Sequence, residues 1–257
     1  MADDLIRATL VRFDAPAGAR RRLICLPFAG GGVATYRTWV KTLPGDVEVL
    51  AVQLPGRSPS RREPAPDTIE ALVRSVLPAL ADVDDLPFAI FGHSMGALLA
   101  FELTVAMEAG GGASPQHLFV SGRRSPDAPP SARPIHALAD EEFLDAIDGR
   151  YGGVPAAVRE EPDLLAMLLP ALRADIRALE TYLPLSGRLV RCPVHVFGGT
   201  DDTNPRPHEL QDWQRVAALP VTVRVFEGDH FYLRNETAAL TGEIGRRWQR
   251  LLAVEPR

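Results

Sequence analysis

The feature that most constrains this chain is a regular alternation of short apolar runs with longer amphipathic segments. The apolar runs are rich in Val, Ile, Leu and Phe and are bounded by Gly or Pro, which is typical of strands buried on both faces. They are Leu23–Phe28, Val47–Leu54, Phe88–Phe91, His117–Ser121, Val194–Phe197 and Val221–Phe226, with Ala8–Phe13 as an added edge strand. The segments between them have the spacing of amphipathic helices: Tyr36–Leu43, Thr68–Leu80, Met95–Ala109, His208–Ala217 and Thr237–Leu252. This order predicts an α/β fold with a mostly parallel central sheet and helices on both faces.

The size and charge of the chain narrow its class further. With 257 residues, 46% of them hydrophobic, it fits one domain over residues 1–257. A net charge of −5 offers no broad basic surface for phosphates, so nucleic-acid binding is disfavoured. No apolar run reaches the roughly 18 to 20 residues of a membrane span, and Cys25 and Cys192 lie in apolar stretches typical of reduced thiols. We therefore expect a cytoplasmic protein that binds neither nucleic acid nor membrane.

Residues 92–96 have the sequence Gly-His-Ser-Met-Gly, which fits the pattern G-x-S-x-G. They follow the run Phe88–Phe91 and begin the helical segment Met95–Ala109, the strand–turn–helix setting of a strained turn that exposes a serine above a sheet. Glycine is needed on both sides, because the strand and helix backbones approach too closely there for a Cβ atom. An ordinary serine in a strand–helix turn is the alternative, and the context favours Ser94 as a nucleophile.

A nucleophilic serine needs a histidine as general base and a carboxylate that orients the histidine. Among the histidines, His230 is favoured because it follows the last strand, at the same end of the sheet as Ser94. The carboxylate should follow the preceding strand, where Asp201 and Asp202 compete. Spacing from Gly199 favours Asp202, and the other aspartate would be a turn or helix-cap residue. The remaining histidines are expected in strands, at the surface or within the turn around Ser94: His93, His117, His136, His195 and His208.

Acyl transfer also needs donors for the negative charge that forms on the carbonyl oxygen. One is the backbone N–H of Met95, at the start of the helix after Ser94. The second normally comes from a loop after an early strand, here residues 27–32 with the sequence Pro-Phe-Ala-Gly-Gly-Gly, and we assign it to Ala29. A phosphate-binding loop is the alternative, but neither G-x-G-x-x-G nor a Walker pattern with its lysine is present.

The alternation breaks between about residues 127 and 188, where a proline-rich stretch leads into helical patterns with no strand between them. Pro170 should kink or split the second of these helices. Ordinary packing at the sheet edge is one interpretation. A helical lid over an apolar cleft is favoured, because the insertion lies in chain order between Ser94 and the other candidate catalytic residues. The positions expected to line the cleft are Phe143, Leu164, Leu168 and Leu172.

Short motifs are spread along nearly the whole chain. They include Leu26–Gly31, Gln53–Arg57, the turn at residues 92–96, Gly152–Pro155, Pro170–Asp175, Glu180–Tyr182, Cys192–Val194 and Gly228–Phe231. Together these segments resemble the type II thioesterases that accompany polyketide and nonribosomal peptide synthases. One departure is Phe28, which stands where many members have histidine and should alter the polarity of the pocket.

The resemblance implies an α/β-hydrolase fold and a serine thioesterase that uses the triad Ser94, His230 and Asp202. It also implies a substrate: acyl groups on the phosphopantetheine arm of acyl or peptidyl carrier proteins, cleared by hydrolysis through an acyl-enzyme without metal or cofactor. Three alternatives stay open: a carboxylester hydrolase of the same fold, a product-releasing domain of a megasynthase, and a non-catalytic relative that only binds carrier proteins. The start at Met1 and the lack of an upstream linker disfavour the second.

Arginines follow two of the predicted strands at their carboxyl ends. In a parallel sheet these ends lie on the catalytic side, beside Ser94. Carrier proteins of this kind are usually acidic, so we expect the arginines to form a local docking patch, with ordinary solvated charge as the alternative. The candidates are Arg57, Arg61, Arg62, Arg123 and Arg124.

Overall fold

The computed structural model describes residues 7–57, 63–81, 83–129, 133–152, 159–185 and 187–252. Its centre is a seven-stranded sheet with the order β1-β3-β2-β4-β5-β6-β7. β1 pairs antiparallel with β3, and all other pairings are parallel. The predicted α/β fold with a mostly parallel sheet is confirmed. The strands are β1 (Thr9–Arg12), β2 (Arg21–Leu26), β3 (Val47–Gln53), β4 (Phe88–His93), β5 (Leu118–Ser121), β6 (Val194–Gly199) and β7 (Thr222–Phe226).

The helices differ in type from the prediction at three places, one of which is the end of the segment Thr68–Leu80, where residues 77–80 form the 3₁₀ helix η2. Two segments expected to be amphipathic α-helices are 3₁₀ helices, η1 and η3, because apolar spacing over nine or ten residues does not separate a period of 3.0 from one of 3.6. Within the described ranges, no helix is long and apolar enough to cross a membrane. The helices are η1 (Val33–Lys41), α1 (Ile69–Val76), η2 (Leu77–Leu80), α2 (Met95–Gly110), α3 (Asp140–Tyr151), α5 (Pro162–Thr181), η3 (Pro207–Val216), η4 (Tyr232–Arg234) and α6 (Thr237–Leu252).

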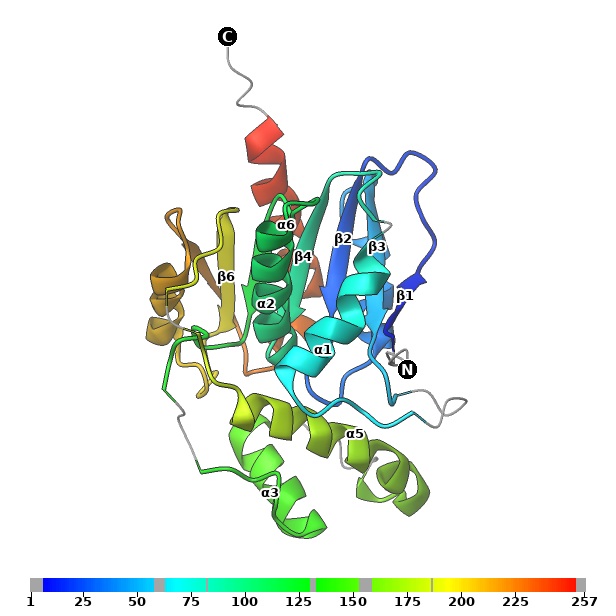
Figure 1. Cartoon of the computed structure of the whole chain (residues 1–257), viewed down its shortest axis with the longest axis vertical. Helices are drawn as coiled ribbons and strands as arrows, with labels where there is room; N and C mark the ends of the chain where they lie inside the picture. The colour runs from blue at the N-terminus through cyan, green and yellow to red at the C-terminus, as the bar shows by residue number, and fades with distance from the viewer. Residues whose placement is uncertain are drawn as a thin grey trace.

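Helices cover both faces of the sheet (Figure 1). On one face, Leu72 of α1 and Leu98 of α2 are fully buried in a core that includes Ile90 of β4. On the other face, Trp39 of η1 and Trp248 of α6 are buried in a second core. Because the strands between them are buried on both sides, the sheet is a rigid support for the loops at its carboxyl end.

α3 and α5 lie between β5 and β6 in the chain and beyond the carboxyl ends of the strands in space (Figure 1). α5 is continuous, so Pro170 does not split it. The carbonyl of Ala166 loses its helical donor there, but both residues are exposed, so water can replace the missing hydrogen bond. A small core joins the two helices: Ile135, Phe143, Leu144, Ile147, Leu169 and Ile176.

Candidate active site

Ser94 lies in a tight turn between β4 and α2. Its backbone has φ 54° and ψ −115°, and in the described part of the chain it is the one non-glycine residue with positive φ. A Cβ atom on Gly92 would lie 1.9 Å from the carbonyl oxygen of Gly96, and one on Gly96 would lie 2.4 Å from that of Leu26. The two glycines therefore permit a strained turn that holds Ser94 at the end of the sheet.

His230 and Asp202 form a buried pair at the same end of the sheet. The Nδ1 atom of His230 lies 2.8 Å from Oδ2 of Asp202, and both side chains are almost fully buried. The other carboxylate oxygen of Asp202 accepts the backbone N–H of Asn204 at 2.9 Å. Asp201 is exposed, and its backbone N–H donates to the carbonyl of Gly228. The structure thus brings Asp202, and not Asp201, to His230.

His93 is buried in the turn and is held by a chain of hydrogen bonds. Its Nδ1 atom lies 2.8 Å from Oγ of Ser121, which lies 2.6 Å from the hydroxyl of Tyr232. Burial lowers the pKa of His93 well below its ordinary value, and the charges of His230 and Arg234 lower it further. His93 is therefore neutral at pH 7 and fixes the turn from behind, as the sequence analysis predicts.

The two predicted oxyanion donors have free backbone N–H groups. Met95 is the first residue of α2, where an N–H has no partner within the helix. In the loop after β2, the N–H of Gly30 donates to Asp175 and that of Gly31 donates to the carbonyl of Phe28. Among the described residues, no acceptor binds the N–H of Ala29 or of Met95. Both groups are thus available to an oxyanion near Ser94.

A buried ion pair joins α5 to this loop. Asp175 accepts a hydrogen bond from the N–H of Gly30 at 2.7 Å and forms an ion pair with Arg57. Arg57 also donates to the carbonyl of Gly31 at 2.9 Å. The side chains of Asp175 and Arg57 are 0% and 7% exposed. A buried pair with these additional hydrogen bonds fixes the loop that carries Ala29 relative to α5.

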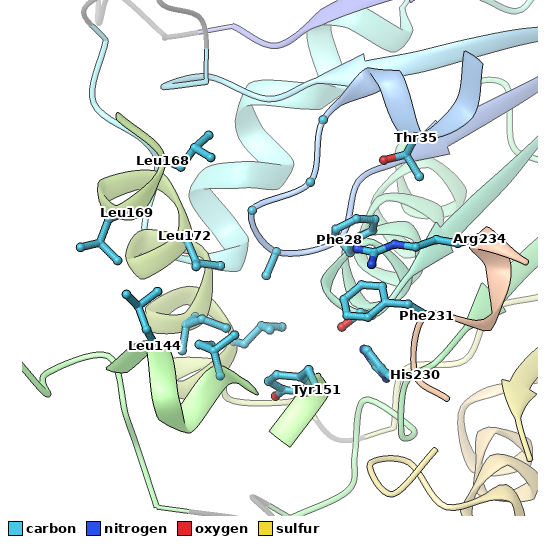
Figure 2. Close-up of a pocket in the computed structure, with 18 of the residues that line it drawn as sticks. Phe28, Thr35, Leu144, Tyr151, Leu168, Leu169, Leu172, His230, Phe231 and Arg234 are labelled. Atoms are coloured by element: carbon cyan, nitrogen blue, oxygen red, sulfur yellow. The ribbon is translucent and has the colours of Figure 1, made fainter. Parts of the chain in front are cut away.

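A cavity of about 300 Å³ lies between this end of the sheet and the two helices of the insertion. Ser94 and His230 line it, and the Nε2 atom of His230 has no hydrogen-bond partner within the described residues. Figure 2 shows leucines of α5 on one side and Phe28, Phe231 and His230 on the other. The remaining wall is mostly aliphatic, so the cavity suits an apolar group placed next to Ser94. The aliphatic residues of α3 and α5 that line it are Leu144, Ile147, Leu165, Leu168, Leu169, Leu172, Ile176 and Leu179.

Comparison with known proteins identifies the family. The thioesterase domain family matches residues 21–247. The chain is also 34% identical over 223 residues to the gramicidin S biosynthesis protein GrsT of Aneurinibacillus migulanus, which covers 87% of each chain. The chain belongs to the thioesterase family. It is a serine thioesterase, a hydrolase of the α/β-hydrolase fold.

Two further relatives narrow the class of thioesterase. Thioesterase PikA5 of Streptomyces venezuelae is 36% identical, over 91% of this chain and 83% of its own. The solved structure of the type II thioesterase BorB, from the borrelidin biosynthetic cluster, matches at 35% identity and a TM-score of 0.81 over 93% of this chain and 95% of its own. These relatives confirm the resemblance to type II thioesterases of polyketide and nonribosomal peptide pathways.

Two of the four positions predicted to line the cleft of this thioesterase do so. Leu168 and Leu172 line the cavity, whereas Phe143 and Leu164 do not. Phe143 is 0% exposed and lies beneath the guanidinium of Arg173, because the face of α3 that carries it packs in the small core between the insertion helices. Sequence reasoning missed Leu144 and Ile147, since one apolar stripe on α3 serves both that core and the cavity.

The predicted docking patch of the thioesterase is wrong at Arg57, which is buried against Asp175 and offers no surface charge. Arg124 pairs with Glu209 at 3.1 Å. Arg123 is partly buried and lines a second cavity. Arg61 and Arg62 lie outside the described residues. The motif that contains Arg57 and the motif that contains Asp175 were both visible in the sequence, but their pairing depends on contacts across 118 positions.

Proposed function

We propose that this thioesterase hydrolyses acyl groups from the phosphopantetheine arm of a carrier protein through a triad of Ser94, His230 and Asp202. The observation that carries the proposal is the shared cavity, which is lined by Ser94 on its strained turn and by His230 paired with Asp202. Relatives named for nonribosomal peptide and polyketide pathways support a carrier-protein substrate and an editing role. The free thiols of Cys25 and Cys192 are compatible with the cytoplasm, where such an enzyme would meet its carrier protein.

In the acylation step, the hydroxyl of Ser94 attacks the thioester carbonyl and its proton moves to Nε2 of His230. Asp202 accepts the Nδ1–H of His230, which fixes the tautomer and stabilises the imidazolium. The N–H groups of Ala29 and Met95 stabilise the charge on the carbonyl oxygen. The C–S bond then breaks, and the proton passes from His230 to the departing sulfur.

In the deacylation step, water attacks the ester on Ser94 while His230 takes its proton. The same two N–H groups stabilise the second oxyanion. Collapse of this intermediate breaks the bond to Ser94, and the proton on His230 returns to the serine oxygen. The products are the free carboxylic acid and the unmodified enzyme.

The insertion between β5 and β6 acts as a lid in this proposal. Its helices supply the aliphatic wall opposite Phe28 and Phe231 (Figure 2), and the Asp175–Arg57 pair anchors α5 to the oxyanion loop. An acyl chain in the cavity would lie against Leu168 and Leu172. The lid therefore selects among acyl chains, while the end of the sheet performs the chemistry.

A hydrolysis panel separates this proposal from the alternatives. One acyl group is presented on a carrier protein, on pantetheine and as an oxygen ester, and kcat/KM is measured for each. We expect the order carrier protein, pantetheine, oxygen ester, because carrier-protein contacts add to recognition of the thioester.

Faster turnover of the oxygen ester would assign a carboxylester hydrolase. Binding of the carrier protein without hydrolysis of any substrate would assign a non-catalytic relative. Ser94→Ala is the negative control, because any hydrolysis that it retains does not depend on the proposed nucleophile.

A further inference from the structure

A second cavity, of about 450 Å³, meets the first one at Ser94. The two cavities also share Tyr151 and Leu179, so they are adjacent at the reacting position. Their walls differ in the charged residues they contain. The first is lined mainly by aliphatic and aromatic residues, whereas the second has three arginines, Arg123, Arg124 and Arg150, and two carboxylates among its prolines and other apolar residues.

Two of these three arginines are neutralised by carboxylates. Arg124 pairs with Glu209 at 3.1 Å, and Arg150 pairs with Glu180 at 3.3 Å. Asp127, an acidic residue of the same wall, is occupied by Arg215 at 2.8 Å. The carboxylates Glu209, Glu180 and Asp127 around the cavity therefore already pair with cations other than Arg123.

Arg123 differs from these residues. In the described ranges its guanidinium has no carboxylate partner and no hydrogen-bond acceptor, although its backbone is well fixed. The carbonyl of Arg123 accepts the indole N–H of Trp213 at 2.8 Å, and the carbonyl of Ser121, two residues earlier, accepts the N–H of Ser94 at 2.8 Å. Burial lowers the pKa of Arg123, and the neighbouring Arg124 lowers it further.

Arg123 is partly buried and lines the second cavity, so its guanidinium is a cation at the cavity wall that has no counter-ion among the described residues. Such a group is compensated when an anion enters the same cavity. A planar guanidinium suits the oxygens of a carboxylate or a phosphate, which it can bind through two parallel hydrogen bonds.

We propose that Arg123 binds an oxyanion carried by the thioester substrate, in the second cavity, while the apolar part of the acyl group occupies the first. This rests on the proposed function, since it assumes a thioester at Ser94. The oxyanion is either the phosphate of the pantetheine arm or a carboxylate on the acyl group. These share one recognition chemistry and differ in where on the substrate they lie.

The test compares three thioesters: propionyl-pantetheine, propionyl-phosphopantetheine and malonyl-pantetheine. Steady-state kcat/KM is measured for the wild type, Arg123→Gln and Arg123→Lys. We expect Arg123→Gln to lower kcat/KM for one of the anionic substrates about tenfold more than for propionyl-pantetheine, mainly through KM, with a smaller effect for Arg123→Lys. The substrate that is affected identifies the source of the oxyanion.

Arg74→Gln is the matched control, because Arg74 is an exposed arginine on α1 away from both cavities. Arg74→Gln should change kcat/KM by the same small factor for all three substrates. Equal losses on all three substrates in Arg123→Gln would overturn the proposal. Hydrolysis of propionyl-pantetheine by the wild type tests the proposed function separately, so the two failures are distinguishable.

Thermal unfolding provides a second readout. Arg123 forms no ion pair in the described ranges and is only partly buried, so Arg123→Gln should leave Tm nearly unchanged. Loss of a structural arginine would instead lower Tm. A clear fall in Tm together with uniform loss of activity would assign Arg123 to the fold and contradict the proposal.

Discussion

Two pairs of histidines lie at opposite ends of the sheet and have nearly the same separation between their rings. At the carboxyl end, the rings of His93 and His230 are 5.0 Å apart. At the amino end, the rings of His117 and His195 are 5.1 Å apart. Each pair includes at least one buried ring nitrogen with no partner among the described residues: Nε2 of His93 and of His230 in the first pair, and Nε2 of His117 in the second. An unpartnered ring nitrogen therefore does not by itself mark a catalytic histidine.

What differs is the surroundings of each pair. His117 and His195 bind each other at 2.9 Å, His195 also lies 2.7 Å from the hydroxyl of Thr222, and both rings stack near Phe119. His230 instead has a carboxylate on one side and lines a cavity with Ser94 on the other. A carboxylate and a cavity shared with Ser94, more than burial or ring contact, distinguish the proposed general base His230 from His117 and His195.

The largest expected difference is between His230→Gln and His195→Gln. Loss of the proposed general base should lower thioester turnover by about three to six powers of ten, whereas His195→Gln should keep turnover within a few fold. Steady-state hydrolysis of an acyl-pantetheine measures both, with circular dichroism as the check on folding. Comparable losses of turnover in the two folded variants would contradict the assignment of different roles to the two pairs.

The next difference concerns the two neighbouring aspartates. Asp202→Asn should lower kcat roughly a hundredfold or more, because the amide no longer fixes the tautomer of His230 or stabilises its charged form. Asp201→Asn should cost far less, since Asp201 is exposed. The measurement is kcat for the two variants. A larger loss in Asp201→Asn than in Asp202→Asn would assign the catalytic carboxylate to Asp201.

A smaller effect is expected from the insertion. Leu168→Trp adds bulk in the cavity and should shift preference toward shorter acyl chains by roughly tenfold, because pocket size sets chain discrimination. Met167→Trp is the control, since Met167 is 50% exposed and is not among the lining residues. Profiles of kcat/KM against chain length test this. If both variants kept the wild-type profile, the insertion would be packing and not a lid.

The pair His117 and His195 should affect the free energy of unfolding at acid pH and not the rate of turnover. Burial lowers the pKa of His117 to about 4 and that of His195 to about 3, from 6.5. As pH falls below 6.5, the unfolded chain binds protons at both residues and the folded chain does not. The free energy of unfolding should therefore decrease between pH 6.5 and about 4, by at most ~2.7 kcal/mol per pH unit for two groups.

Urea unfolding at several pH values measures this slope. His117→Phe retains a ring that can stack on Phe119 and removes one titrating group, so the slope should become shallower. An identical slope in this variant would show that His117 is not buried in its neutral form.

The sequence predicted the carboxyl end of the sheet better than the insertion, for a physical reason. Ser94 and Asp202 follow buried strands, His230 follows the partly exposed edge strand β7, and parallel strands bring such positions to one edge. The wall of the cavity depends instead on how α3 and α5 are rotated against the sheet. The apolar stripe of a helix does not show which part of it faces the cavity. For this reason Phe143 was expected to line the cavity, whereas it packs in the small core beside it.

The arginines show the same limit. Arg57 and Arg123 both follow strands on the catalytic side, and both were expected to dock a carrier protein. Their difference comes from one distant residue: Asp175 of α5 meets Arg57, and no described carboxylate meets Arg123. The sequence around each arginine shows that a charge is present, but it does not show which distant residue pairs with it.

Turnover through an acyl group on Ser94 can be observed by intact-mass spectrometry of acid-quenched reactions. During turnover of an acyl-pantetheine, the protein should gain the mass of one acyl group, located on the peptide that contains Ser94. The adduct should form and decay at rates compatible with kcat, and it should be absent in Ser94→Ala. Absence of any adduct during rapid turnover, an adduct on another residue, or more than a tenth of wild-type activity in Ser94→Ala would contradict the account.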